Sequence, residues 1–164
     1  MIIDAIYLRM PDPVQGIGEQ YGMPIGIYVE GGHESPLYMN DDRRCSYWND
    51  KRMMPAGGFG REMWEAVDAT CRTLWGEGWQ HAVSEIWGIN RRTLQRDRVM
   101  SNLLPPRVLR MISTIASMPD AKDMASALFS YARIAKGEGA ASRWALIPEL
   151  FDEISTIPEP APAI

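Results

Sequence analysis

The segment around Gly88 constrains this chain more than any other, because one helix must end there and another must begin almost at once. Apolar side chains recur at helical spacing from Trp79 to Trp87, and a glycine just past them supplies the left-handed turn that ends a helix. Asn90 is the predicted N-cap of the second helix, since its side-chain oxygen can accept a hydrogen bond from the amide of Arg92 or Thr93. The sequence therefore predicts two short helices that meet at a tight corner.

Three residues are predicted to hold this corner together. Ser84 is a small residue where the first helix must approach the second closely, and Ile89 and Leu94 are the apolar residues just after the glycine. The outward positions of the second helix carry long hydrogen-bonding side chains, namely Asn90, Arg91, Arg92, Gln95 and Arg96. Side chains of this kind suit the edges of guanine and adenine, or phosphates.

Residues 63–118 resemble the phage-repressor-like helix-turn-helix family of the Cro and lambda-repressor (XRE-like) type. The likeness is to a bacterial subgroup in which the recognition helix is followed by a proline-led helix, here LLPPRVLRMI. The resemblance implies that a helix from Asn90 to Val99 enters a major groove, with Gln80 on a phosphate of the same half-site. Asp97 departs from the family's usual apolar or aromatic residue, and Ser84 replaces the commoner alanine. Asp97 is expected either to face the groove, where it could select cytosine, or to turn inward and pair with Arg92 or Arg98.

Charge is distributed unevenly along the chain. Between Gly88 and Arg110 six arginines (91, 92, 96, 98, 107 and 110) face one acid, Asp97, although the whole chain has a net charge of −4. A basic stripe on an acidic body is oriented toward DNA by its own field, and arginine favours bidentate recognition. The alternative is an arginine-rich face that is only solvated, or that meets an acidic protein.

Two functions remain open. In the first, the protein is a sequence-specific transcriptional regulator of phage or mobile-element type, which binds an operator in double-stranded DNA as a homodimer. Its candidate DNA-binding residues are Gln80, Asn90, Arg91, Arg92, Gln95, Arg96 and Arg98. In the second, it is a protein-interaction module or phage-encoded inhibitor of a host system, whose partner binds the N-terminal region. We expect no enzymatic activity, cofactor or metal, because the chain lacks a phosphate-binding loop, a nucleophile elbow and metal-ligand spacing.

Two stretches within the first 58 residues show a period of two in their apolar side chains, which predicts strands. Ile2, Ile6, Leu8 and Met10 share one parity, and 23–29 follow the same period of two. Gly31 and Gly32 offer a turn before a third short strand at 37–39. The stretch 40–60 mixes charged and aromatic residues and is predicted to be a long loop, with Cys45 as a loop thiol. Its residues Arg43, Arg44, Tyr47, Trp48, Lys51 and Arg52 could grip nucleic acid, but anchoring of the loop by its aromatics is the favoured reading.

Helical spacing resumes beyond the loop. It predicts an α+β fold, with a mainly helical helix-turn-helix core, a small N-terminal antiparallel sheet and additional C-terminal helices. The expected parts are a β-rich region at 1–58, a DNA-binding domain at 59–118, C-terminal helices at 119–155 and a disordered tail at 156–164. Those C-terminal helices, one of them carrying Trp144 to Ile154, should pack on the sheet or on a second subunit. No apolar run is long enough to span a membrane, and we expect a cytoplasmic protein.

Overall fold

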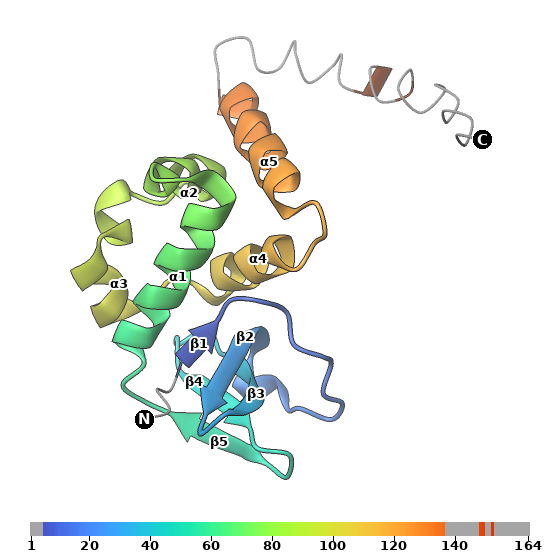
Figure 1. Cartoon of the computed structure of the whole chain (residues 1–164), viewed down its shortest axis with the longest axis vertical. Helices are drawn as coiled ribbons and strands as arrows, with labels where there is room; N and C mark the ends of the chain where they lie inside the picture. The colour runs from blue at the N-terminus through green and yellow to red at the C-terminus, as the bar shows by residue number, and fades with distance from the viewer. Residues whose placement is uncertain (1–4, 137–147, 150–151, 153–164) are drawn as a thin grey trace.

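The computed structural model describes residues 5–136, 148–149 and 152. It begins with a five-stranded antiparallel meander in which each strand pairs with the next along the chain. The strands are β1 (Ala5–Tyr7), β2 (Met23–Glu30), β3 (His33–Met39), β4 (Cys45–Trp48) and β5 (Met53–Ala56). The α-helices follow the sheet in the sequence and lie on one side of it (Figure 1). The predicted α+β class, with an N-terminal antiparallel sheet and a helical core, is confirmed.

The prediction of a long loop at 40–60 is wrong, because β4 and β5 form a hairpin there. Asn49 closes its turn, since the side-chain oxygen accepts hydrogen bonds from the amides of Lys51 (3.2 Å) and Arg52 (2.9 Å). Each strand has only four residues, too few for a clear alternation of apolar side chains. Cys45, predicted to be a loop thiol, is the first residue of β4 and is buried.

Five α-helices and two 3-10 helices complete the described chain. The α-helices are α1 (Gly60–Trp75), α2 (Trp79–Trp87), α3 (Arg96–Asn102), α4 (Pro106–Ala116) and α5 (Ala121–Lys136), and the 3-10 helices are η1 (Glu19–Tyr21) and η2 (Arg91–Leu94). The predicted helix starts at Gly60 and at the proline pair before α4 are confirmed. The predicted last helix lies outside the described residues, apart from Pro148, Glu149 and Asp152.

The second helix of the corner is broken, contrary to the expectation of one helix from Asn90 to Val99. η2 ends at Leu94, Gln95 is extended (φ −76°, ψ 150°), and α3 then begins. Leu94 and Val99 are both almost fully buried. Residues five apart on a continuous helix point in directions about 140° apart. The break at Gln95 therefore lets both side chains reach the core.

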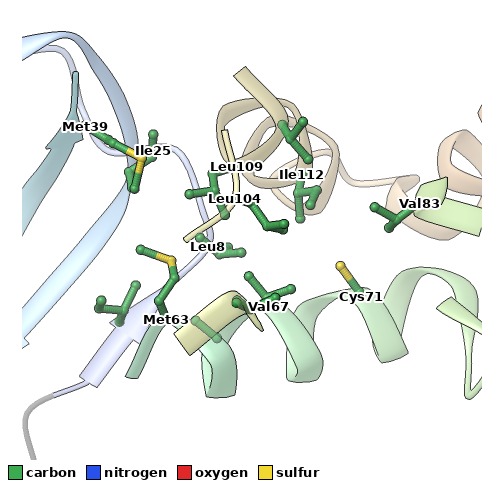
Figure 2. Close-up of a cluster of buried hydrophobic side chains, with 14 of the residues drawn as sticks. Leu8, Ile25, Met39, Met63, Val67, Cys71, Val83, Leu104, Leu109 and Ile112 are labelled. Carbon is green, nitrogen blue, oxygen red and sulfur yellow. The ribbon is translucent and has the colours of Figure 1, made fainter. Parts of the chain in front are cut away.

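One continuous core joins the sheet to the helices. α4 lies across β2 and α1 packs on β1. Figure 2 shows Ile25 and Met39 of the sheet close to Met63 of α1 and Leu109 of α4. The sheet side chains are therefore covered by helices that also support the corner.

The C-terminal helices are predicted to pack on the sheet or on a second subunit, but the last described helix packs on other helices of the same chain. α5 lies against α1 and α2, and the indole Nε1 of Trp75 donates to the carbonyl of Ala125 (2.8 Å). None of the helices in the described ranges is long and apolar enough to cross a membrane.

Candidate nucleic-acid interface

The corner between α2 and η2 has the predicted backbone geometry. Gly88 is left-handed (φ 67°, ψ 26°), and the Asn90 side chain accepts a hydrogen bond of 2.9 Å from the amide of Arg92. The hydroxyl of Ser84 donates to the carbonyl of Ile89 (2.6 Å), while Leu94 is fully buried beneath the turn. Ser84 thus adds a bond across the corner that an alanine at this position would lack.

Most of the predicted DNA-binding residues are exposed and close in the chain. Asn90, Arg91, Arg92, Gln95, Arg96 and Arg98 are exposed and extend from the corner through η2 into α3. Gln80 is half-buried in the first turn of α2. It lies eight residues before Gly88, about 12 Å along the helix axis. The predicted set therefore forms a contiguous cluster with one separate member, Gln80.

The arginines between 91 and 110 differ in their partners from three arginines of the body. Arg9 forms an ion pair with Glu34, and Arg61 forms one with Glu65. Arg72 pairs with both Asp68 and Glu77. Hydrogen bonds to these carboxylates raise the pKa of Arg61 and of Arg72. Within the described residues, no hydrogen bond or ion pair engages the guanidinium group of any of the six arginines (91, 92, 96, 98, 107 and 110). All six side chains are exposed, so the five N–H donors of each guanidinium group can reach a ligand.

Arg107 extends this set onto α4. It precedes Met111 by one helical turn, so both lie on the same face of the helix. The sulfur of Met111 is 3.4 Å from the indole Nε1 of Trp87, the last residue of α2. Trp87 directly precedes Gly88, so this contact brings the Arg107 face of α4 beside the corner.

Asp97 does not turn inward to pair with Arg92 or Arg98. Its side chain is exposed in the first turn of α3, and no ion pair within the described residues includes it. A carboxylate in the first turn of a helix is stabilised by the helix dipole. This position accounts for an acid where an apolar residue was expected, because the break at Gln95 makes Asp97 an N-terminal residue of a new helix.

Arg43 is a residue whose role the sequence did not reveal. Its guanidinium Nη1 donates to the carbonyls of Asn102 (2.7 Å) and Leu103 (2.9 Å), at the end of α3. It therefore ties the β3–β4 turn to the proposed DNA-binding segment across 59 residues of sequence. Tyr47, from the same stretch, packs against Tyr28 with ring centroids 5.0 Å apart.

The described residues offer little for metal or thiol chemistry. They contain no group of three or more His, Cys, Asp or Glu side chains placed to hold a metal ion. Burial raises the pKa of the Cys45 thiol to about 11 and raises that of Cys71 as well. Both thiols therefore remain protonated near neutral pH and are poor nucleophiles.

Comparison of the chain with models of known families, with curated proteins and with solved structures found no match.

Proposed function

We propose that this protein is a sequence-specific regulator of transcription, of phage or mobile-element type, that binds double-stranded DNA through η2 and α3. The observation that carries the proposal is the set of exposed arginines between residues 91 and 110, in a chain of net charge −4, whose guanidinium groups have no partner among the described residues. Three arginines elsewhere in the body, Arg9, Arg61 and Arg72, pair with nearby carboxylates. Guanidinium groups that lack such partners are suited to phosphates and guanine edges.

We propose different roles for the two parts of the broken second helix. Arg91 and Arg92 on η2 and Gln95 at the break are proposed to read base edges, since they follow the corner directly. Arg96 and Arg98 on α3, with Gln80 on α2, are proposed to contact phosphates and fix the orientation of the protein. An α-helix with its side chains is about 10–12 Å across, which fits a major groove about 12 Å wide. Asn90 serves as the cap that orients η2.

A homodimer is part of the proposal. A single small module of this kind buries roughly 600–1,000 Å² on DNA, and two half-sites about one helical turn apart double that contact. The expected operator is therefore an inverted repeat.

Binding-site selection from random duplex DNA tests the proposal, followed by anisotropy titrations of the selected duplex at several salt concentrations. The test variant is Arg91→Ala/Arg92→Ala. The matched control is Arg9→Ala/Arg61→Ala, which removes the same charge from two exposed arginines that already have carboxylate partners. Each base-reading arginine that is removed should weaken binding roughly 10-fold to 100-fold. The double variant should also reduce the slope of log affinity against log salt concentration by about 2.

The control separates a specific interface from general attraction. It should keep most of the affinity for the selected duplex. Equal losses in both double variants would mean that only net charge matters. Failure to enrich any duplex would refute the proposal and favour an acidic protein partner for the arginine face.

A further inference from the structure

A cleft lies where the sheet meets the end of α3. Its volume is about 460 Å³, within the range of small-molecule sites, and it opens between η1, the β3–β4 turn, the end of β5 and Leu103. Two arginines line it and no carboxylate does. The remaining wall is largely apolar and includes the rings of Tyr21 and Phe59. This combination of an apolar wall with a few convergent polar groups is typical of ligand sites.

Arg43 is held in place on one side of this cleft. Its Nη1 binds the two carbonyls at the end of α3, whereas Nη2 and Nε have no partner within the described residues. Its backbone is left-handed (φ 61°), and Leu103, which accepts one of its bonds, also has a positive φ of 22°. Such backbone strain in ordinary residues is found at ligand clamps. The Nε and Nη2 groups of this guanidinium can therefore donate hydrogen bonds to a planar anion without a change in side-chain conformation.

The second arginine and the opposite wall complete the site. Arg44 is exposed and has no ion pair within the described chain. Phe59 is fixed by packing against Tyr28, with ring centroids 4.7 Å apart. Gly58 leaves open space beside it, because an added Cβ would meet no atom within 4 Å. An anionic head near the arginines would therefore have an aromatic surface for its apolar body.

We propose that this cleft binds a small molecule with an apolar or aromatic body and a carboxylate or phosphate head, and that Arg43 transmits binding to α3. The anion engages Nη2 and Nε of Arg43, which fixes the guanidinium and strengthens the hold of Nη1 on the end of α3. Ligand binding in the cleft does not depend on the proposed function, whereas regulation of DNA affinity by the ligand rests on it. Ligand and DNA would then raise each other's affinity by the same factor.

Nitrogen-15 NMR on the full chain tests the site without DNA. The probes are phenyl phosphate, benzoate and the neutral phenol. With at least one anion, we expect chemical-shift changes that saturate at millimolar anion concentration. These changes should occur at the amides of Arg44 and Gly58, and also at those of Asn102 and Leu103. Phenol should produce none, and the stronger of the two anions identifies the preferred head group. Absence of saturation with both anions overturns the proposal.

Two variants separate binding from transmission. Arg44→Glu should weaken the anion at least 10-fold, whereas Arg52→Glu, the same charge change on the β4–β5 turn, should leave it unchanged. Equal losses would overturn the site. Arg43→Gly suits the positive φ, so the turn should survive. This variant should keep weaker shifts at Arg44 but lose those at Asn102, which accepts a bond from Arg43 and does not line the cleft. Persistence of the Asn102 shifts in this variant would refute transmission through Arg43.

A DNA titration then distinguishes the two proposals. The better anion should raise affinity for the selected duplex in the wild type and not in Arg43→Gly. If the anion binds but no duplex does, the cleft stands and the proposed function fails. If the duplex binds and neither anion does, the reverse holds.

Discussion

Gly88→Ala is the sharpest test of the corner, because its cost arises from backbone conformation alone. Gly88 has φ 67°, and a Cβ added there would meet no atom within 4 Å. An alanine in this conformation costs about 1–2 kcal/mol. The reduced entropy of the unfolded chain returns about 0.4–1 kcal/mol, for a net loss of about 1 kcal/mol. For a chain of this size that corresponds to a fall in Tm of about 3 °C.

Two further glycines calibrate this value. Gly76, which ends α1, also has open space but adopts φ 77° and ψ −163°, a region that is almost restricted to glycine. Gly76→Ala should therefore cost more than Gly88→Ala, about 2–3 kcal/mol. Gly57 has open space and no positive φ, so Gly57→Ala should be neutral or slightly stabilising. Gly88→Asn should be milder than alanine at the same position, because asparagine tolerates the left-handed region.

Urea unfolding, followed by tryptophan fluorescence and far-UV circular dichroism, measures these differences. The expected order of stability is Gly57→Ala, wild type, Gly88→Asn, Gly88→Ala and Gly76→Ala. A Gly88→Ala variant as stable as the wild type would mean that the corner does not need a left-handed residue. A Gly57→Ala variant as unstable as Gly88→Ala would show that the loss has another cause.

Two further predictions concern the buried core. The hydroxyl of Ser113, which is fully buried, donates to the carbonyl of Ile25 at the irregularity in β2. Ser113→Ala should therefore lower the free energy of unfolding in urea by about 1–3 kcal/mol. A loss no larger than that of Thr114→Ala, a change at the exposed neighbour, would contradict this role. The Cys45 pKa is raised from 9.0 to about 11 by burial, so its contribution to stability is present below pH 9 and declines by about 2 kcal/mol as the pH rises from 9 to 11. The fall in unfolding free energy between pH 8 and 11 should be shallower in Cys45→Ala than in the wild type, and parallel pH profiles would refute the assignment.

The sequence was most informative where the structure depends on neighbouring residues. Gly88 and Asn90 gave the corner, because a helix end and a helix cap require particular side chains over a few positions. The starts of α1 and α4 and the first three strands followed from spacing and turn residues in the same way. The hairpin at 45–56 was missed, although Asn49 and Asp50 carried a turn signal, because its strands are too short for periodicity.

The break at Gln95 could have been found from the five-residue spacing of Leu94 and Val99, had their burial been known. Whether a given apolar residue is buried depends on which elements surround it, and here the core receives side chains from both the sheet and the helices. The packing of α5 on α1 and α2, rather than on the sheet, depends on the same choice among several apolar faces.

Local sequence thus determined the α+β class, the tight corner and the basic character of the segment after it. Only the tertiary structure decided which arginines find carboxylate partners, how the second helix divides and what the end of α3 contacts. Arg43 illustrates the difference, because its partners lie 59 and 60 residues away. Caps and turns are fixed by interactions between residues a few positions apart, whereas ion pairs and clefts depend on distances set by the packing of the whole chain.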